Sequence, residues 1–303
     1  MSVPTAWNEL HRQLHESLVI LPDKPEETSE GTLKALWQKA LGNSVSAVKA
    51  DTLPLEELNQ QQLNRLRNLI AQRLAGIPLA HLTGRQNFMG IEFIVGPEAL
   101  VPRRETELLA AAALEQAREC ALHLKSLTIV DVCTGSGNVA LALASHLQRD
   151  NIPAKIFAAD LSEDAVQLAQ KNADNLALNH IVEFRAGDLL APFELARFAN
   201  STDLLTCNPP YINRAKVESM PIEIAAHEPR LAFDGGPFGV SILMRLIDEA
   251  PRYLKPGGWL VFEVGLGQGP ALVKRMERNS VYSEIKTTCD AAGAIRALSI
   301  RKT

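Results

Sequence analysis

Apolar side chains in the first quarter of the chain recur at nearly helical spacing. Leucine and isoleucine residues within 55–74 lie three or four positions apart, which predicts a helix with one buried face. A further amphipathic segment opens at Ala6 and another helix is predicted at Leu33–Leu41, with a Pro- and Glu-rich break at residues 22–30 between them. We therefore expect a helical N-terminal region.

The pattern changes after this region. Residues Phe88–Val95 and then Leu100–Pro102 read as two short strands, and Gly96-Pro97 between them is a typical turn pair. We expect a β-hairpin that links the helical region to the rest of the chain.

Beyond a predicted helix at Glu105–Leu124, short apolar runs alternate with helical segments. Such alternation, with strands that are apolar on both faces, predicts an α/β domain with a doubly wound, mostly parallel sheet. The predicted strands are residues 127–132, 154–159, 181–186, 203–207 and 259–264, and the predicted helices are 138–147, 162–175 and 240–254. The domain prediction is a helical domain at 1–86, a hairpin linker at 87–104 and an α/β domain at 105–303.

Composition narrows the class of protein. A length of 303 residues favours two domains, and a net charge of −4 argues against a protein that holds long nucleic acid by neutralising phosphates. The four cysteines form no C-x-x-C pair, which favours free thiols in a reducing compartment and no metal site. No apolar stretch approaches the ~18 residues of a membrane span, so we expect a cytoplasmic protein.

A glycine-rich turn follows the first predicted strand of the α/β domain. It begins at Asp131, continues through Cys133 and Thr134, and ends in Gly135-Ser136-Gly137. Small residues at this position let a backbone approach a nucleotide-like cofactor. A carboxylate at Asp131 would repel a dinucleotide pyrophosphate but suits a sulfonium cofactor with an amino group, which favours S-adenosylmethionine.

Two further acids stand where the next strands end. Asp160 is placed to accept hydrogen bonds from ribose hydroxyls, although it also precedes a helix and could serve only as an N-terminal acid. Asp188 is a candidate partner for an adenine amino group, with Leu189 against the ring. A loop aspartate that caps a turn is the alternative for Asp188.

The sequence Asn208-Pro209-Pro210-Tyr211 follows the fourth predicted strand. Prolines have no N–H, so the carbonyl groups of this motif are free to accept hydrogen bonds. An amide nitrogen is a poor nucleophile because its lone pair is delocalised, and it must be oriented to react. We expect the Asn208 side-chain oxygen and the Pro209 carbonyl to accept the two amide hydrogens, while Tyr211 stacks on the flat acceptor group.

These motifs together resemble the HemK or PrmC group, the protein-(glutamine-N5) methyltransferases that modify peptide chain release factors. The resemblance covers nearly the whole chain, including Pro78–Gly84, Phe88–Glu107, His227–Gly236 and the spacing Asp290-x-x-Gly293-x-x-Arg296. It implies a Rossmann-like class I methyltransferase fold, with an N-terminal region that helps to recognise a protein substrate. It also implies a set of residues that line the cofactor: Cys133, Thr134, Gly135, Ser136, Gly137, Asp160, Leu189 and Asn208.

Two positions depart from the pattern of this family. A glycine is common where Cys133 stands, and an aromatic residue sometimes occurs where Leu189 stands. The Cys-Thr-Gly-Ser-Gly turn also resembles the sister group that methylates a glutamine of a large-subunit ribosomal protein. The segments Pro78–Gly84 and Asp290–Arg296 favour the release-factor branch.

Other functions are compatible with parts of the sequence. Exocyclic amines of nucleic-acid bases need the same two acceptors and a stacking ring, so a base N-methyltransferase is an alternative. An oxidoreductase or a binding module would leave Asn208 and Tyr211 without a role. Glu263 follows the fifth strand and is either structural or part of the acceptor pocket. We expect a monomer without stable nucleic-acid binding.

Overall fold

The computed structural model of the chain describes residues 3–21, 23–212, 222–236 and 239–303. It divides into two compact units. One unit contains Met1–Pro97, Val101–Arg104 and Met220–Glu228, and the other contains Glu98–Leu100, Glu105–Ser219 and Pro229–Thr303. The chain therefore passes between the units several times, and a short segment downstream of the Asn-Pro-Pro-Tyr motif belongs to the N-terminal unit.

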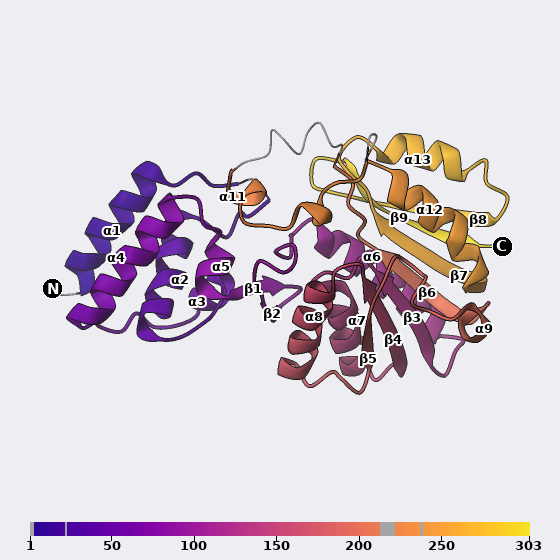
Figure 1. Cartoon of the computed structure of the whole chain (residues 1–303), viewed down its shortest axis with the longest axis horizontal. Helices are drawn as coiled ribbons and strands as arrows, with labels where there is room; N and C mark the ends of the chain where they lie inside the picture. The colour runs from indigo at the N-terminus through magenta and orange to yellow at the C-terminus, as the bar shows by residue number, and fades with distance from the viewer. Residues whose placement is uncertain (1–2, 22, 213–221, 237–238) are drawn as a thin grey trace. The chain divides into compact units, whose positions relative to one another are not determined.

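The N-terminal unit is built from helices (Figure 1). Polar side chains cap the N-termini of two of them. The Thr28 hydroxyl accepts the N–H of Gly31, and Asn59 forms a capping box with Gln62. Buried side chains from several of these helices, among them Leu14, Trp37, Leu66 and Ile70, form one hydrophobic cluster. The helices are α1 Val3–Ser17, α2 Ser29–Leu41, α3 Ala47–Ala50, α4 Gln60–Leu74 and α5 Leu79–Thr83. Pro22, in the predicted break, lies outside the described residues.

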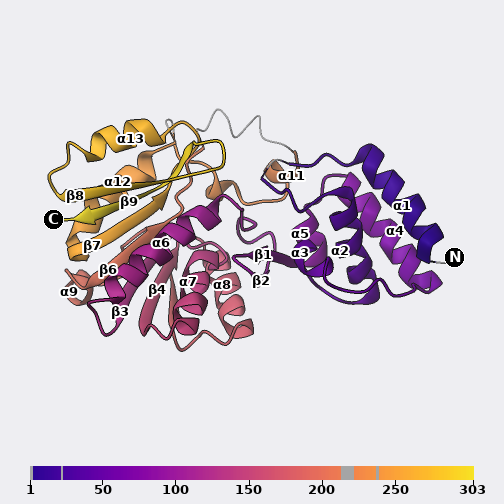
Figure 2. The ribbon, with the colours of Figure 1, turned by 180° about the vertical axis from the view of Figure 1, so that it is seen from behind.

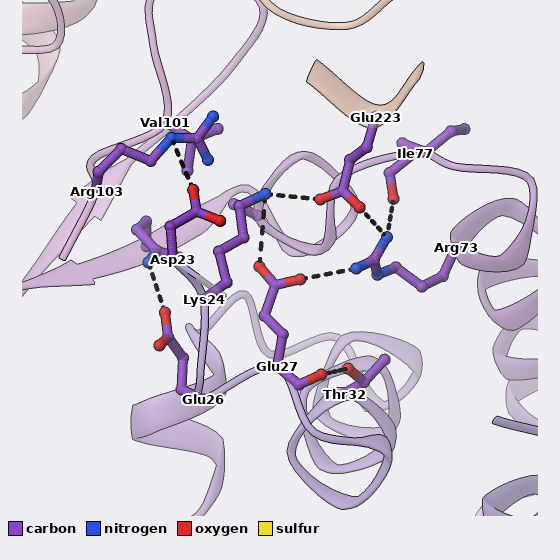
Figure 3. Close-up of polar contacts among 12 residues, drawn as sticks. Asp23, Lys24, Glu26, Glu27, Thr32, Arg73, Ile77, Val101, Arg103 and Glu223 are labelled. Carbon is purple, nitrogen blue, oxygen red and sulfur yellow. Dashed lines mark hydrogen bonds and ion pairs between the residues drawn. The ribbon is translucent and has the colours of Figure 1, made fainter. Parts of the chain in front are cut away.

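A short helix, α11 Ile222–Ala225, is held in this unit by buried charges (Figure 3). Glu223 accepts hydrogen bonds from the Lys24 ammonium at 2.6 Å and from the Arg73 guanidinium at 2.8 Å. Arg73 also pairs with Glu27 at 2.9 Å. Burial disfavours the ionised form of Glu223, but the two cations outweigh it and lower the pKa of this carboxyl.

A hairpin forms here, but from other strands than predicted, and residues 100–102 are not a strand. Strand β1 Arg85–Phe88 pairs antiparallel with β2 Ile91–Ile94, so Met89 and Gly90 make the turn rather than Gly96-Pro97. Both turn residues have positive φ, 50° and 77°. A two-residue turn with this conformation matches the right-handed twist of the flanking strands. Its usual sequence signal is an Asn-Gly or Asp-Gly pair, which is absent here.

Seven strands of the described chain form the sheet of the second unit, in the order β5-β4-β3-β6-β7-β9-β8. The first five in this order are parallel, and β9 and β8 add an antiparallel edge. This confirms the predicted doubly wound, mostly parallel fold. The strands are β3 Leu127–Val132, β4 Ala154–Asp160, β5 Val182–Ala186, β6 Thr202–Cys207, β7 Leu254–Glu263, β8 Tyr282–Cys289 and β9 Ile295–Lys302.

Helices cover both faces of this sheet (Figures 1 and 2). Alternate residues of the strands, such as Val130 and Val132 of β3, share one core cluster with side chains from α12 and α13. The other helices that pack on the strands, α6, α7 and α8, contact one another. The helices are α6 Thr106–Ala121, α7 Asn138–Arg149, α8 Glu163–Asn175, α9 Leu195–Phe198, α12 Ser241–Glu249 and α13 Gly269–Met276.

Two details of the second unit differ from the prediction. The predicted helix at 240–254 ends at Glu249, and a 3-10 turn over Ala250–Arg252 follows it. Pro251 causes this change because it has no N–H and cannot continue an α-helix. The antiparallel strands β8 and β9 were not predicted.

Within the described residues, no helix combines the length and apolar character needed to span a membrane.

Candidate functional site

The glycine turn follows β3, and hydrogen bonds to Asp131 fix it to the sheet. The Asp131 side chain is 1% exposed; one oxygen accepts the Thr134 hydroxyl at 2.5 Å and the other accepts the Thr206 hydroxyl of β6 at 2.6 Å. Burial raises the pKa of Asp131 to about 6, against the opposing effect of both hydroxyls. The carboxylate that the sequence placed in the cofactor set therefore fastens the turn to the sheet.

The turn has the conformation that a close approach of a ligand requires. Cys133, Gly135 and Gly137 have positive φ values of 57°, 54° and 80°. A Cβ atom on Gly137 would lie 3.1 Å from Ala169, so only glycine fits there. The Ser136 hydroxyl is buried and has no hydrogen-bond partner among the described residues. A buried hydroxyl in this position suits a polar group of a bound cofactor.

Asp160, at the end of β4, connects this turn with the next helix. Its carboxylate accepts the N–H groups of Gly135 at 2.8 Å and of Ser162 at 2.9 Å. Burial raises the pKa of Asp160, and these backbone bonds oppose the shift. Each carboxylate oxygen has a second lone pair, so Asp160 can hold the turn and still accept a ribose hydroxyl. The Ser162 side chain, rather than Asp160, caps α8.

The residues after β5 lie in two different environments. Asp188 is exposed and forms an ion pair with Arg245 of α12 at 2.9 Å, a partner that the sequence analysis did not identify. Leu189 has a positive φ of 48° and packs into the core cluster with 4% of its surface exposed. The predicted adenine contacts of these two residues stay predictions.

The acceptor motif begins directly after β6. The Asn208 side-chain nitrogen, Nδ2, donates to the Thr106 hydroxyl at 3.0 Å. Thr106 is the first residue of α6 and is 2% exposed. The amide of Asn208 is thereby held at its nitrogen end. Its oxygen can then accept a hydrogen bond from an N–H group of a bound substrate.

Tyr211 is anchored at its hydroxyl by a buried acid. The Tyr211 hydroxyl donates to Glu263 Oε1 at 2.9 Å, and Glu263, the last residue of β7, is 1% exposed. Burial raises the pKa of Glu263 to about 7, and hydrogen bonds from Thr106 and Tyr211 oppose this shift. Gly265 leaves room for the tyrosine ring, because a Cβ there would lie 2.9 Å from Tyr211 Cδ2. Glu263 is thus a structural partner of Tyr211, and its membership of an acceptor pocket stays a prediction.

The backbone of residues 233–235 lies next to the acceptor motif. Pro209 is buried and Pro210 is half-buried. Ile212, just beyond the motif, exchanges backbone hydrogen bonds of 3.0 Å with Phe233 and Gly235. A Cβ on Gly235 would lie 2.5 Å from the Pro210 carbonyl oxygen, so this approach requires a glycine.

The sheet brings the two predicted motifs together. Val132 of β3 is the register partner of Cys207 in β6 and of Ala159 in β4, so the residues that follow all three strands are neighbours. Cys133, Asn208 and Asp160 therefore meet at one edge of the sheet. The sequence analysis missed Thr106, Thr206, Arg245 and Gln268, whose amide nitrogen donates to the Tyr211 carbonyl at 3.2 Å. No group of three His, Cys, Asp or Glu side chains in the described parts of the chain could hold a metal ion.

Comparison with known proteins gives two family matches. Residues 123–293 match the model of a methyltransferase domain, and residues 20–84 match the model of the PrmC N-terminal domain. The chain is 39% identical over 241 residues to the release factor glutamine methyltransferase of Moorella thermoacetica, covering 80% of this chain and 81% of that protein. It is 32% identical over 243 residues to the Bacillus subtilis protein of the same name, covering 80% and 82%.

A solved structure shows the same fold at low sequence identity. The hMettl16 catalytic domain, in complex with the MAT2A 3′UTR hairpin 6, superposes with a TM-score of 0.53 at 15% identity, over 77% of this chain and 81% of that one. This likeness concerns the fold alone. The substrate has to be argued from the site.

Proposed function

The chain belongs to the family of release factor glutamine methyltransferases, and from that premise we propose that it transfers a methyl group from S-adenosylmethionine to a glutamine side chain. The acceptor atom is the amide nitrogen, N5, of the glutamine in the Gly-Gly-Gln loop of a peptide chain release factor. One observation carries the proposal: Asn208, with its amide nitrogen bound to Thr106, lies in register beside the glycine turn.

The residues of the turn fit the methyl donor. The unpartnered Ser136 hydroxyl and the second lone pairs of Asp160 are available to polar groups of the cofactor, and Gly135 and Gly137 let the backbone come close. S-adenosylmethionine supplies an electrophilic methyl group on a sulfonium. We infer that its site is lined by Asp131, residues 133–137, Asp160, Asp188, Leu189 and Asn208.

The acceptor motif orients the amide. Asn208 Oδ1 and the Pro209 carbonyl accept its two N–H groups and turn the face of the nitrogen towards the methyl group. The nitrogen–carbon bond forms as the sulfur–carbon bond breaks, and the nitrogen then loses a proton to water. Tyr211, held by Glu263, offers a ring face to the flat amide and to the charge shared by nitrogen and sulfur. Alignment therefore supplies most of the catalysis.

We assign substrate recognition to the helical region at 1–86 and propose a monomer that acts in the cytoplasm. The test is incubation of the pure protein with labelled S-adenosylmethionine and, separately, a release factor, the large-subunit ribosomal protein and bare nucleic acid. We expect label on the release-factor glutamine. Label on the ribosomal protein would assign the sister branch, and label only on nucleic acid would overturn glutamine as the acceptor.

Asn208→Ala tests the role of the acceptor motif. Because the variant removes the amide acceptor but leaves the turn intact, kcat should fall by about 100-fold or more, while the Kd for S-adenosylmethionine changes by less than about tenfold. Asn175→Ala, at an exposed position near the end of α8, serves as the control and should keep full turnover. Undiminished methylation by Asn208→Ala would refute the assigned role.

A further inference from the structure

Two buried polar side chains from different elements, Thr106 and Glu263, hold the two ends of the acceptor motif. Thr106 opens α6, Glu263 ends β7, and Asn208 follows β6. Asn208 Nδ2 donates to Thr106 Oγ1 at 3.0 Å, and the Tyr211 hydroxyl donates to Glu263 Oε1 at 2.9 Å. Thr106 and Glu263 are almost fully buried, with 2% and 1% of their surface exposed. Neither side chain is placed to serve a surface role.

The orientation of the Asn208 amide decides whether this residue can help the reaction. The two ends of an asparagine amide have nearly the same shape, and a rotation of 180° exchanges its acceptor for two donors. A glutamine amide presents N–H groups at its nitrogen, so it needs the oxygen end of Asn208. If the nitrogen of Asn208 faced the substrate instead, its N–H groups would point at the N–H groups of the glutamine amide and no hydrogen bond would form.

The Thr106 hydroxyl has only one proton to give, and Glu263 determines where it goes. Glu263 Oε1 takes the Tyr211 hydroxyl, while Oε2 is buried without another hydrogen-bond partner in the described chain. The Thr106 hydroxyl lies close enough to this carboxyl to lower its pKa, so it is the candidate donor to Oε2. An ionised carboxylate can only accept, so it takes the Thr106 proton and leaves the Thr106 oxygen as an acceptor for Asn208 Nδ2.

We propose that Thr106 and Glu263 are positioning residues that hold the Asn208 amide in the single orientation in which its oxygen faces the methyl acceptor. In this arrangement Asn208 donates to Thr106, the Thr106 hydroxyl turns its proton to Glu263, and the other oxygen of the same carboxylate holds Tyr211. Both recognition elements of the acceptor site thus depend on one buried acid. The inference rests on the amide-methylation reaction proposed above.

Glu263→Gln is the sharpest variant because it reverses the direction of this chain. If the glutamine oxygen keeps the Tyr211 hydroxyl, the glutamine nitrogen donates to the Thr106 oxygen and the Thr106 proton turns to Asn208. Asn208 must then rotate, so that its oxygen faces Thr106 and its nitrogen faces the substrate. Turnover on the release factor should fall by about 10- to 100-fold, with the Kd for S-adenosylmethionine unchanged. Glu284→Gln, at a half-exposed carboxylate of β8, is the matched control and should keep full turnover.

Thr106 provides a second pair of variants that separates packing from hydrogen bonding. Thr106→Val keeps the shape and removes the hydroxyl, so kcat should fall by a similar factor. Thr106→Ser keeps the hydroxyl and should restore most of the turnover. Equal losses in the valine and serine variants, or full turnover in Thr106→Val, would overturn the proposal.

The pH profile gives a readout that a purely structural role would not move. Glu263 must be ionised to accept the Thr106 proton, and burial holds its pKa at about 7. The charged groups that act on it are Arg296 of β9, which lowers this pKa, and Glu105 beside α6, which raises it. We expect kcat of the wild-type protein to rise as pH increases through about 7, and this rise to vanish in Glu263→Gln.

A measurement without turnover separates this inference from the proposed function. In the ¹⁵N-labelled full-length protein, the Asn208 side-chain NH₂ protons should exchange slowly with water in the wild type and Thr106→Ser, and quickly in Thr106→Val and Glu263→Gln. If the wild type methylates no release factor but shows this pattern, the proposed substrate fails and the positioning role stands. Equal exchange in all four proteins would refute the positioning role whatever the activity.

Discussion

At the scale of single residues, the backbone conformation of the site depends on a few positions. Cys133 and Leu189 both have positive φ, a conformation that costs an L-residue about 1 kcal/mol and a glycine almost nothing. This explains why glycine is common in the family where Cys133 stands. The thiol is accommodated because it packs against the core cluster beside Cys207.

Gly235 gives a prediction at this scale. A methyl group there would lie 2.5 Å from the Pro210 carbonyl oxygen and 2.8 Å from Gly239 Cα. These contacts are with backbone that cannot move aside cheaply. Gly235→Ala should therefore lower the free energy of unfolding by about 2–3 kcal/mol and reduce turnover as well, because the prolines of the acceptor motif are displaced.

Urea unfolding and steady-state kinetics would measure both effects. Gly293→Ala is the comparison, since this glycine has a φ of 81° with open space around it and should cost only about 1 kcal/mol, from strain alone. Equal stability of the two variants, together with full turnover in Gly235→Ala, would show that the close approach to Pro210 has no consequence.

Among the helices, α11 is held mainly by buried ion pairs, whereas longer helices are held mainly by apolar contacts. Helix α11 has only four residues, too few to bury a large apolar face. It is held in the N-terminal unit through Glu223, whose partners are Lys24 and Arg73 (Figure 3). A segment downstream of the acceptor motif thus owes its position to residues from the beginning of the chain.

Arg73→Ala tests this arrangement. The arginine side chain is 2% exposed, and its removal leaves Glu27 and Glu223 with too little positive charge in a buried place. The free energy of unfolding should fall by about 3–5 kcal/mol. Arg67→Ala, on the same helix, removes only an exposed pair with Glu9 and should cost less than about 1 kcal/mol. Equal midpoints of urea unfolding in the two variants would contradict a supporting role for the buried network.

At the scale of the whole molecule, stability and activity should respond to pH in opposite directions. The pKa of Glu263 is about 7 in the folded protein, against 4.5 for an ordinary glutamate. The folded state therefore binds a proton more tightly than the unfolded state. This contribution to stability is complete below about pH 4.5 and is lost as pH rises through about 7.

The difference amounts to about 3 kcal/mol between the two ends of this pH range. Glu263→Gln cannot ionise, so its free energy of unfolding should lose less with rising pH than that of the wild type, while Glu284→Gln should follow the wild type. Urea unfolding at several pH values measures this. Parallel curves for the wild type and Glu263→Gln would show that the pKa of Glu263 is not raised.

The fold class and the two motifs of the site can be predicted from the sequence alone. Alternating apolar runs and helical segments predicted the parallel strands because burial on both faces leaves a local trace in each strand. The motifs were visible because glycines and prolines restrict the backbone locally, as at Gly137 and Pro209. The hairpin turn at Met89-Gly90 and the antiparallel strands β8 and β9 escaped prediction. The turn lacks an Asn-Gly or Asp-Gly pair, and most residues of β8 are exposed or half-exposed.

The hydrogen-bond partners of the charged and polar residues around these motifs follow from the packing of segments that are distant in the sequence. The hydrogen-bond partners of Asp131 are Thr134 and Thr206, and the second of these lies 75 positions away along the chain. Thr106 and Asn208 are 102 positions apart and meet because α6 packs against the sheet where β6 ends. A hydrogen bond between distant segments has no period in the sequence, so packing alone determines which side chain orients another.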